Sequence, residues 1–354
     1  MASTSNVLKA SDLVNGQLYN DLSLKDLEWT LAGGSSSETQ TWYFYTKTGK
    51  FGFVQLLHSN IGIFYPTIQY NCRFFGEGIS LWKSVNSSGF KLSPDRRSAS
   101  CDGMSIQLNP EGTLYTVSLK IGNETFVSFQ FEKIDRGFKI GEGKTFLGSD
   151  SSSTNFVSHK FLPKGRITGV LVHNGVEHEL EGDGLFVHAI QGLMPHLIAS
   201  KWNFVNLQGP EGSVCMIQFE TTPQYGNVRV NQGAVVVDNK LIGVSVENEV
   251  EYVESELDAE TGYHVPTETR YTWKGKCVDD DTPFSVTIQQ RPTVLVDKID
   301  VLSEVPYFLR KLVQAFVAKP FVYQWFDDSK AEIVIGDRTI TLEGKVFHEC
   351  TFIN

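Results

Sequence analysis

Residues 165–208 read G-R-I-T-G-V-L-V-H-N-G-V-E-H-E-L-E-G-D-G-L-F-V-H-A-I-Q-G-L-M-P-H-L-I-A-S-K-W-N-F-V-N-L-Q, and the fold is decided here. The first part predicts a β-hairpin with arms at residues 167–173 and 176–181. Asn174-Gly175 between the arms suits a two-residue turn that needs positive φ.

The second part of the stretch predicts a bend and then a helical segment. Gly182-Asp183-Gly184 allows a sharp bend of the backbone. Residues 185–193 carry apolar side chains at helical spacing, and Pro195 favours a break after them. Because strand-rich sequence lies on both sides, we interpret the stretch as the junction of two β domains.

The chain before this junction predicts a β domain. Ser23 to Leu27 is typical of a capped helical turn, with Ser23 as the cap. Val127, Phe129 and Phe131 alternate with polar residues, which indicates a half-buried strand. The strands expected in this half are residues 42–45, 51–58, 64–75, 79–84, 104–108, 113–121 and 125–134.

The chain after the junction repeats this style and adds one long helix. Residues 299–318 carry an apolar stripe at helical spacing, and Pro320 ends the helix. The strands expected in this half are residues 213–222, 226–237, 241–252, 267–274, 284–291, 293–297, 321–326, 332–335 and 339–347.

Together these patterns predict a mainly β protein with two tandem barrels or strongly curved sheets. We expect a flexible segment at residues 1–18, one domain at residues 19–182 and a second at residues 183–354. A small barrel fills its interior with side chains or holds one apolar ligand.

Composition narrows the function. The formal net charge of −10 argues against binding to nucleic acid, whose phosphates need a positive face. The five cysteines form no C-x-x-C pair, and the polar start lacks a secretory signal pattern, so we expect a reduced intracellular compartment. No apolar run approaches the ~18 residues that span a bilayer.

No motif for a metal, a cofactor or a nucleophile emerges, so we expect none of the three and no catalytic residue. His173 and His178 sit on opposite arms of the hairpin, but without a third ligand they are better interpreted as exposed histidines.

Polar and aromatic residues at two places form the candidate ligand-binding set. One is the end of the strand at residues 51–58, and the other lies within residues 186–206. In the competing interpretation, Trp202 is a core residue and the other candidates hydrogen-bond to buried backbone groups. The candidates are His58, His188, His196, Trp202, Asn203 and Asn206.

Five motifs resemble the fungal survival-factor family. The resemblance runs in the same order from about Ser23 to the C-terminus. The motifs are S-L-K-D-L-E-W (residues 23–29), G-K-F-G-F-V-Q-L-L-H-S-N-I (49–61), F-V-H-A-I-Q-G-L-M-P-H-L-I-A-S-K-W-N-F (186–204), V-L-S-E-V-P-Y-F (301–308) and A-K-P-F-V-Y-Q-W (318–325).

The resemblance implies tandem lipocalin-like domains, survival under oxidative stress, and binding and transfer of ceramide. The expected partner is therefore an apolar lipid, with transient membrane contact and no nucleic acid. Well-known members dock on Golgi membrane through an N-terminal amphipathic helix, whereas residues 1–22 here are polar and include Gly16. We therefore expect the cytoplasm, with the nucleus as a second compartment, and not stable Golgi or endoplasmic-reticulum docking.

A more distant resemblance to bacterial lipocalin-like carotenoid hydratases supplies the alternative function. Those enzymes have an Asp-His pair where this chain reads Val187-His188, and W-x-W where it reads Trp202-Asn203-Phe204. We expect His188 to lack an acid partner, so a binding protein is favoured. A hydratase, isomerase or cyclase with His188 as acid–base, and a stress-signalling scaffold with filled barrels, stay open.

Overall fold

The computed structural model describes residues 6–60, 66–193, 195–301 and 320–353, without the side chains of residues 195 and 196. The chain divides into two compact units, each considered by itself below. The first unit is Ala10–Phe146 with Asp150–Met194, and the second is mainly Pro195–Asn354. The strand Gly182–Gln191 thus belongs to the first unit, and independent folding within the limits 19–182 and 183–354 stays a prediction.

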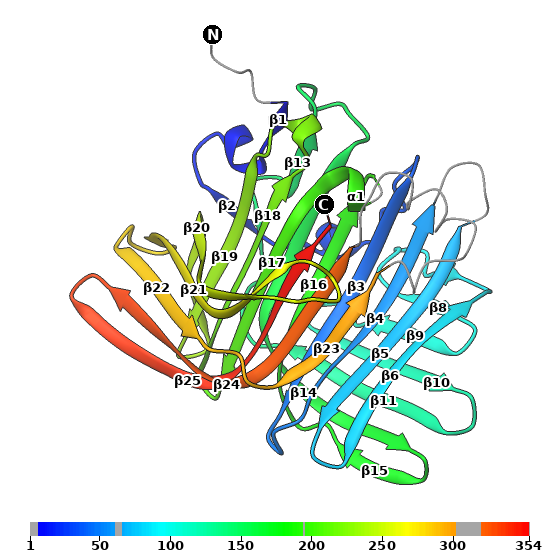
Figure 1. Cartoon of the computed structure of the whole chain (residues 1–354). Helices are drawn as coiled ribbons and strands as arrows, with labels where there is room; N and C mark the ends of the chain where they lie inside the picture. Colours follow the sequence, from blue (N-terminus) through cyan, green and yellow to red (C-terminus); the bar gives the residue numbers. More distant parts are fainter. Residues whose placement is uncertain (1–5, 61–65, 194, 302–319, 354) are drawn as a thin grey trace. The chain divides into compact units, whose positions relative to one another are not determined.

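The first unit is one curved antiparallel sheet, in which β3, β4, β5 and β6 run side by side (Figure 1). Its two end strands, β6 and β7, do not pair with each other among the described residues, so of the two predicted forms this unit is a curved sheet and not a closed barrel. In spatial order its strands are β6 (Ile79–Ser87), β5 (Thr67–Gly76), β4 (Phe51–Asn60), β3 (Ser36–Thr46), β16 (Gly182–Gln191), β14 (Phe156–His173), β11 (Thr125–Lys133), β10 (Leu114–Ile121), β9 (Met104–Leu108), β8 (Ala99–Cys101) and β7 (Lys91–Leu92).

Short elements complete this unit. The strands β13 and β15 pair with β14, and β2 pairs with β12. Ser23 donates its backbone N–H and its Oγ–H to Asp26, at 2.9 and 2.7 Å, which confirms the capped turn. The bounds are η1 (Ala10–Leu13), β2 (Tyr19–Asp21), η2 (Leu24–Leu27), β12 (Phe138–Ile140), β13 (Lys144–Leu147) and β15 (Val176–Glu179); β1 is Val7–Leu8.

The second unit is a nine-stranded antiparallel sheet that closes, because β22 also pairs with β24. Its strand order is β22 (Pro283–Gln290), β21 (His264–Cys277), β20 (Lys240–Leu257), β19 (Arg229–Val237), β18 (Gly212–Thr221), β17 (Ala199–Gly209), β25 (Arg338–Phe352), β24 (Phe321–Ile335) and β23 (Leu295–Asp300). The short helices α1 (Pro195–Ile198) and η3 (Pro223–Tyr225) complete the described part.

The structure confirms the hairpin at the centre of the sequence argument and most of the expected strands. Asn174 and Gly175 have φ of 51° and 77°, as the two-residue turn requires. The helical interpretation of residues 185–193 is wrong, because Gly182–Gln191 is the strand β16 between β3 and β14. Residues spaced by four lie on one side of a strand as well as of a helix, so the pattern was ambiguous.

The glycines before that segment serve close packing and not a bend. A Cβ on Gly182 would lie 2.1 Å from the carbonyl oxygen of Tyr45, and one on Gly184 would lie 2.4 Å from that of Tyr43. The neighbouring strand β3 therefore approaches β16 at positions that only glycine tolerates.

The long helix expected at residues 299–318 is not found in the described part of the chain. Ile299 and Asp300 belong to β23, so a helix beginning at Ile299 is wrong. Residues 302–318 lie outside the described residues, and no long helix occurs elsewhere in the described ranges.

Aromatic side chains fill the interior of the first unit. Phe44 is fully buried, and its ring centroid lies 4.6 Å from that of Phe129 and 5.5 Å from that of Phe74. These rings come from β3, β11 and β5, so distant parts of the sheet are packed together through them.

We predict that Phe44→Ala lowers the free energy of unfolding of the first unit by about 3–5 kcal/mol, because it leaves a cavity among packed rings. Phe126→Ala is the matched control, since Phe126 on β11 is 43% exposed and its loss should cost less than about 0.5 kcal/mol. Denaturant unfolding of both variants measures the difference. Equal losses would contradict a core centred on Phe44.

Candidate functional site

Neighbouring strands of the first unit place polar side chains on the core side of the sheet at one level. In the register, His58 of β4 lies opposite Glu38 of β3, and His188 of β16 lies opposite both Gln40 of β3 and Lys160 of β14. Side chains alternate along a strand, so Glu38 and Gln40 share their face with the buried ring of Trp42. The members of this interior cluster are all buried: Glu38, Gln40, His58, Lys160 and His188.

Glu38 and His188 form the centre of the interior cluster. Nε2 of His188 lies 2.7 Å from Oε1 of Glu38, and both side chains are almost completely buried. The carboxylate also accepts the backbone N–H groups of Thr30, at 2.8 Å, and Leu31, at 2.7 Å. His188 therefore has an acid partner, and the expectation that it lacks one is wrong.

The segment from Ser23 to Leu31 is held over the interior cluster. The ring centroid of Trp29 lies 6.0 Å from that of His188. Arg96 donates its Nε–H to the carbonyl of Trp29 at 2.8 Å, which fixes the backbone whose N–H groups reach Glu38. Lys160 donates to the carbonyl of Asp26, also at 2.8 Å.

Electrostatics set the protonation states of the interior cluster. Burial raises the pKa of Glu38, but the hydrogen bond and charge of His188 and the two N–H donors outweigh it and leave the pKa lowered. Burial lowers the pKa of His58, against the charge of Glu38, so this imidazole is neutral at physiological pH. Burial also lowers the pKa of Lys160, opposed by Asp26 and Glu38.

The same interior holds buried polar atoms that make no hydrogen bond to any residue the structure describes. They are Nδ1 of His188, Oε1 and Nε2 of Gln40, Nε1 of Trp29 and of Trp42, and Oη of Tyr115. An unsatisfied buried donor or acceptor costs about 1–3 kcal/mol, so native structures rarely collect them. Such a collection is suited to a polar head group that would complete the missing hydrogen bonds.

The residues selected from the sequence belong to both units. His58 and His188 join the interior cluster of the first unit. Trp202, Asn203 and Asn206 lie on β17 in the second unit, where Trp202 stacks on Phe219 at 5.2 Å. Asn203 points to the opposite face of β17 from Trp202 and Asn206. The side chain of His196 lies outside the described residues, and ligand contact by any of these residues stays a prediction.

Sequence reasoning missed Glu38, Gln40 and Lys160. A signal for the first two was present, because residues 36–46 read S-S-E-T-Q-T-W-Y-F-Y-T and the alternation puts Glu38 and Gln40 on the face of Trp42 and Phe44. A carboxylate on the apolar face of a strand needs a buried partner.

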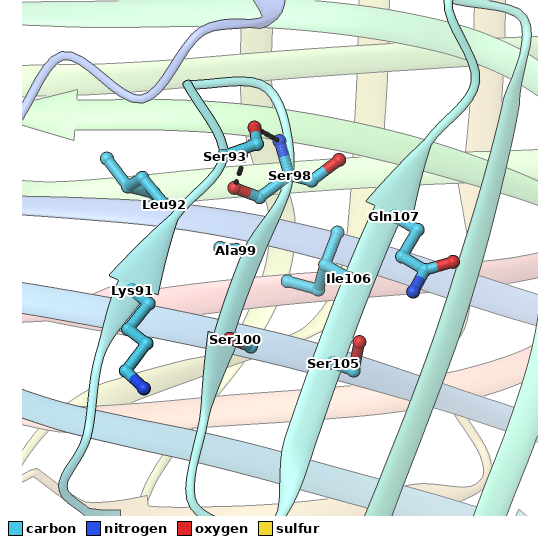
Figure 2. A pocket seen from close by; sticks show the side chains of 9 residues that line it. All are labelled: Lys91, Leu92, Ser93, Ser98, Ala99, Ser100, Ser105, Ile106 and Gln107. Atoms are coloured by element: carbon cyan, nitrogen blue, oxygen red, sulfur yellow. Dashed lines mark hydrogen bonds between the residues drawn. The ribbon is translucent and has the colours of Figure 1, made fainter. Parts of the chain in front are cut away.

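A pocket of about 280 Å³ lies along β7, β8 and β9 (Figure 2). Its lining includes Lys91, Gln107 and the serines Ser93, Ser98, Ser100 and Ser105, with Leu92, Ala99 and Ile106 as apolar members. Typical pockets for small molecules hold about 300–1,000 Å³ and are mostly apolar. This one is therefore a poor match for a long hydrocarbon chain.

Neither a metal-binding group of side chains nor a membrane-spanning helix is found among the described residues. Among those residues, no group of three or more His, Cys, Asp or Glu side chains is placed to hold a metal ion. None of the helices described there is long and apolar enough to cross a membrane.

Comparison with known sequences gives matches along the whole chain. The model of the Svf1 family matches residues 2–354. A protein of Schizosaccharomyces pombe called ceramide-binding protein svf1 is 34% identical over 344 residues, which cover 95% of this chain and 90% of the relative. A protein of the same name from Emericella nidulans is 32% identical over 345 residues, with the same coverage.

Comparison with solved structures supports the fold. CghA with Sch210972 has a TM-score of 0.62 at 9% identity and covers 90% of this chain and 89% of its own. A putative AttH from Nitrosomonas europaea has a TM-score of 0.61 at 12% identity and covers 97% and 99%. At these identities the likeness concerns the fold alone, which is mainly β and lipocalin-like.

We predict that Glu38→Gln lowers the free energy of unfolding of the first unit by about 3 kcal/mol at neutral pH, because it breaks a buried pair. Glu132→Gln is the matched control on β11, with a side chain 57% exposed, and should change stability by less than about 0.5 kcal/mol. Denaturant unfolding of the two variants and the wild type tests this.

The direction in which pH changes the stability of the first unit follows from the pKa of Glu38. Because folding lowers the pKa of Glu38 from 4.5, the ionised carboxylate stabilises the fold above pH 4.5, and this contribution disappears as the pH falls through the folded-state pKa. Acidification below pH 4.5 should therefore destabilise the wild type more than Glu38→Gln. Parallel stability curves for the two proteins would contradict an ionised, paired Glu38.

Proposed function

The chain belongs to the Svf1 family, and from this membership we propose that it is a non-enzymatic protein that binds ceramide or a similar sphingolipid. The observation that supports this most directly is the set of unsatisfied polar atoms around the Glu38–His188 pair inside an aromatic interior. Ceramide combines hydroxyl and amide groups with two long hydrocarbon chains. A site for it needs both kinds of surface.

In the proposed complex the head group of the lipid reaches the interior cluster. Nε2–H of His188 donates to Glu38, so Nδ1 is the atom left for the ligand. The amide of Gln40, opposite His188 on β3, offers one donor and one acceptor. Hydroxyl and amide groups donate and accept, so they match both partners.

The hydrocarbon chains supply most of the binding energy in this proposal. Each buried CH₂ contributes about 0.8 kcal/mol, whereas a neutral hydrogen bond contributes about 0.5–1.5 kcal/mol. The interior beside the cluster offers the rings of Trp42, Tyr115 and Phe186, whose centroids lie 4.9–5.4 Å apart. The polar atoms would therefore orient the ligand, and the aromatic surface would hold it.

We predict that His188→Gln weakens binding of a fluorescent short-chain ceramide about tenfold, because roughly 1.4 kcal/mol of head-group interaction is lost. His264→Gln is the matched control, since His264 is exposed on β21, and should bind like the wild type. Equilibrium titration of the three proteins provides the measurement. If the folded His188→Gln variant binds ceramide with unchanged affinity, the head group does not bind at this cluster.

One observation favours a second function, in which His188 acts as an acid–base on an apolar substrate. A buried imidazole 2.7 Å from a carboxylate is an arrangement that general acid–base catalysis uses. Binding is nevertheless preferred, because Glu38 is already saturated by His188, Thr30 and Leu31. Mass spectrometry of lipid recovered after incubation separates the two: unchanged lipid supports binding, and a product that disappears in His188→Gln supports catalysis.

We further propose that the protein supports survival under oxidative stress and works in the cytoplasm, also in the nucleus, with transient membrane contact. Lipid transfer between membranes requires such contact. Replacement of the gene by the His188→Gln form in its own host should then lower survival in peroxide toward that of a deletion. Survival equal to wild type would separate stress resistance from lipid binding.

A further inference from the structure

The second unit has a polar cluster of its own, at the end of its sheet where the aromatic residues gather. The register places Asn203 of β17 opposite Cys350 of β25, and His348 of β25 opposite Trp325 of β24. Alternation puts Asn203 on the same face as Val205, which belongs to the apolar core. These polar side chains therefore point inward.

Hydrogen bonds connect the residues of this cluster, but one nitrogen of His348 takes no part in them. Tyr252 donates its Oη–H to Oδ1 of Asn203 at 2.7 Å. Oη of Tyr271 lies 3.1 Å from Nδ1 of His348. His348 is fully buried, and its Nε2 makes no hydrogen bond to any residue in the described ranges.

Aromatic rings pack beside His348. The ring of Trp325 stacks on the imidazole at 5.0 Å with an interplanar angle of 21°. Farther out, Phe352 packs on Tyr263 at 4.8 Å and on Tyr252 at 6.4 Å. These last three side chains are partly exposed, and Tyr323 connects Phe352 to Trp325 through ring contacts with centroids 6.0 Å apart.

The polar groups at the centre of this cluster are uncharged at physiological pH. Burial lowers the pKa of His348 to about 3 and raises the pKa of Cys350 to about 11. Burial also raises the pKa of Tyr252 and of Tyr271. Uncharged surroundings disfavour a charged ligand group, which would lose its hydration without gaining a counter-charge.

The ammonium group of Lys201 lies over two of these aromatic rings. Nζ of Lys201 lies 3.7 Å from the centroid of the Tyr252 ring and 5.9 Å from that of Phe352. Burial lowers the pKa of Lys201, opposed by Cys350 and Glu220. The ammonium group thus lies on aromatic faces, whereas Nε2 of His348 makes no hydrogen bond to any residue in the described ranges.

The first unit contains a similar buried histidine, which is hydrogen-bonded to a different kind of residue. There, too, one nitrogen of a buried histidine is hydrogen-bonded, the other makes no hydrogen bond to a described residue, and a tryptophan ring lies beside the imidazole. Glu38 holds His188, whereas the neutral phenol of Tyr271 holds His348. The two units therefore differ in the charge around the imidazole.

We propose that the second unit contains a separate binding site for an uncharged amphiphile, an apolar molecule with one hydroxyl or amide group that bonds to Nε2 of His348. The site stands on the contacts of the second unit alone and does not rest on the function proposed for the first. It gives the chain a second site, whose histidine is paired with a neutral phenol and not with a carboxylate.

The test uses the full chain carrying His188→Gln, which weakens the cluster of the first unit. Calorimetric titration with 1-decanol, decanoate and decylammonium compares three heads on one chain length. We expect decanol to bind one to one and each charged probe to bind at least about tenfold more weakly. If decanoate binds most tightly, Lys201 is the group that binds the ligand, and the proposal is overturned. Failure of decanol to bind would also overturn it.

Variants then locate the bound probe. Adding His348→Gln should weaken decanol about tenfold, and adding Tyr271→Phe, which keeps the ring in the core, should weaken it about threefold by freeing the imidazole. His264→Gln, on the exposed part of β21, should change nothing. If His348→Gln fails to fold, Tyr271→Phe decides, and unchanged binding in the folded variant would overturn the proposal. A ceramide affinity that depends on His188 is a separate result, and it would stand even if the site at His348 were disproved.

Discussion

The hydrogen bond between Glu38 and His188 places a carboxylate and an imidazole inside an interior otherwise filled by aromatic rings. A buried carboxylate is tolerated only when it is paired and fully hydrogen-bonded, and this requirement dictates much of the surrounding structure. The backbone of Thr30 and Leu31 must reach Glu38, and Arg96 holds the preceding residue in place. The N-terminal segment therefore belongs to the site as much as the strands do.

The pair also shows how an apolar interior can hold a polar atom in a fixed position. Glu38 fixes which nitrogen of His188 is used, so the other nitrogen is left with a defined position among packed side chains. The second unit reaches a similar arrangement with Tyr271 and His348 but without a charge. Two sheets of related design can in this way offer differently charged surroundings to ligands with similar chains.

Much of the fold follows from local patterns, whereas the site depends on distant contacts. The turn at Asn174-Gly175 was readable because only certain residues accept positive φ, and the strands were readable from alternation. The helix predicted at residues 185–193 was wrong, since the apolar spacing there fits both periods and only the strands on either side of β16 decide between them. His188 was selected from the sequence, but Glu38 lies 150 residues away, so no local pattern could pair them.

The most direct test of the central claim is the nitrogen NMR spectrum of the His188 side chain in the full chain, assigned by its loss in His188→Gln, with and without a short-chain ceramide. We expect the Nδ1 resonance to move when the lipid is added, because that atom gains a hydrogen bond, while Nε2 stays paired with Glu38 and moves little. A saturating ceramide that leaves both resonances unchanged would contradict the claim that this pair receives the lipid head.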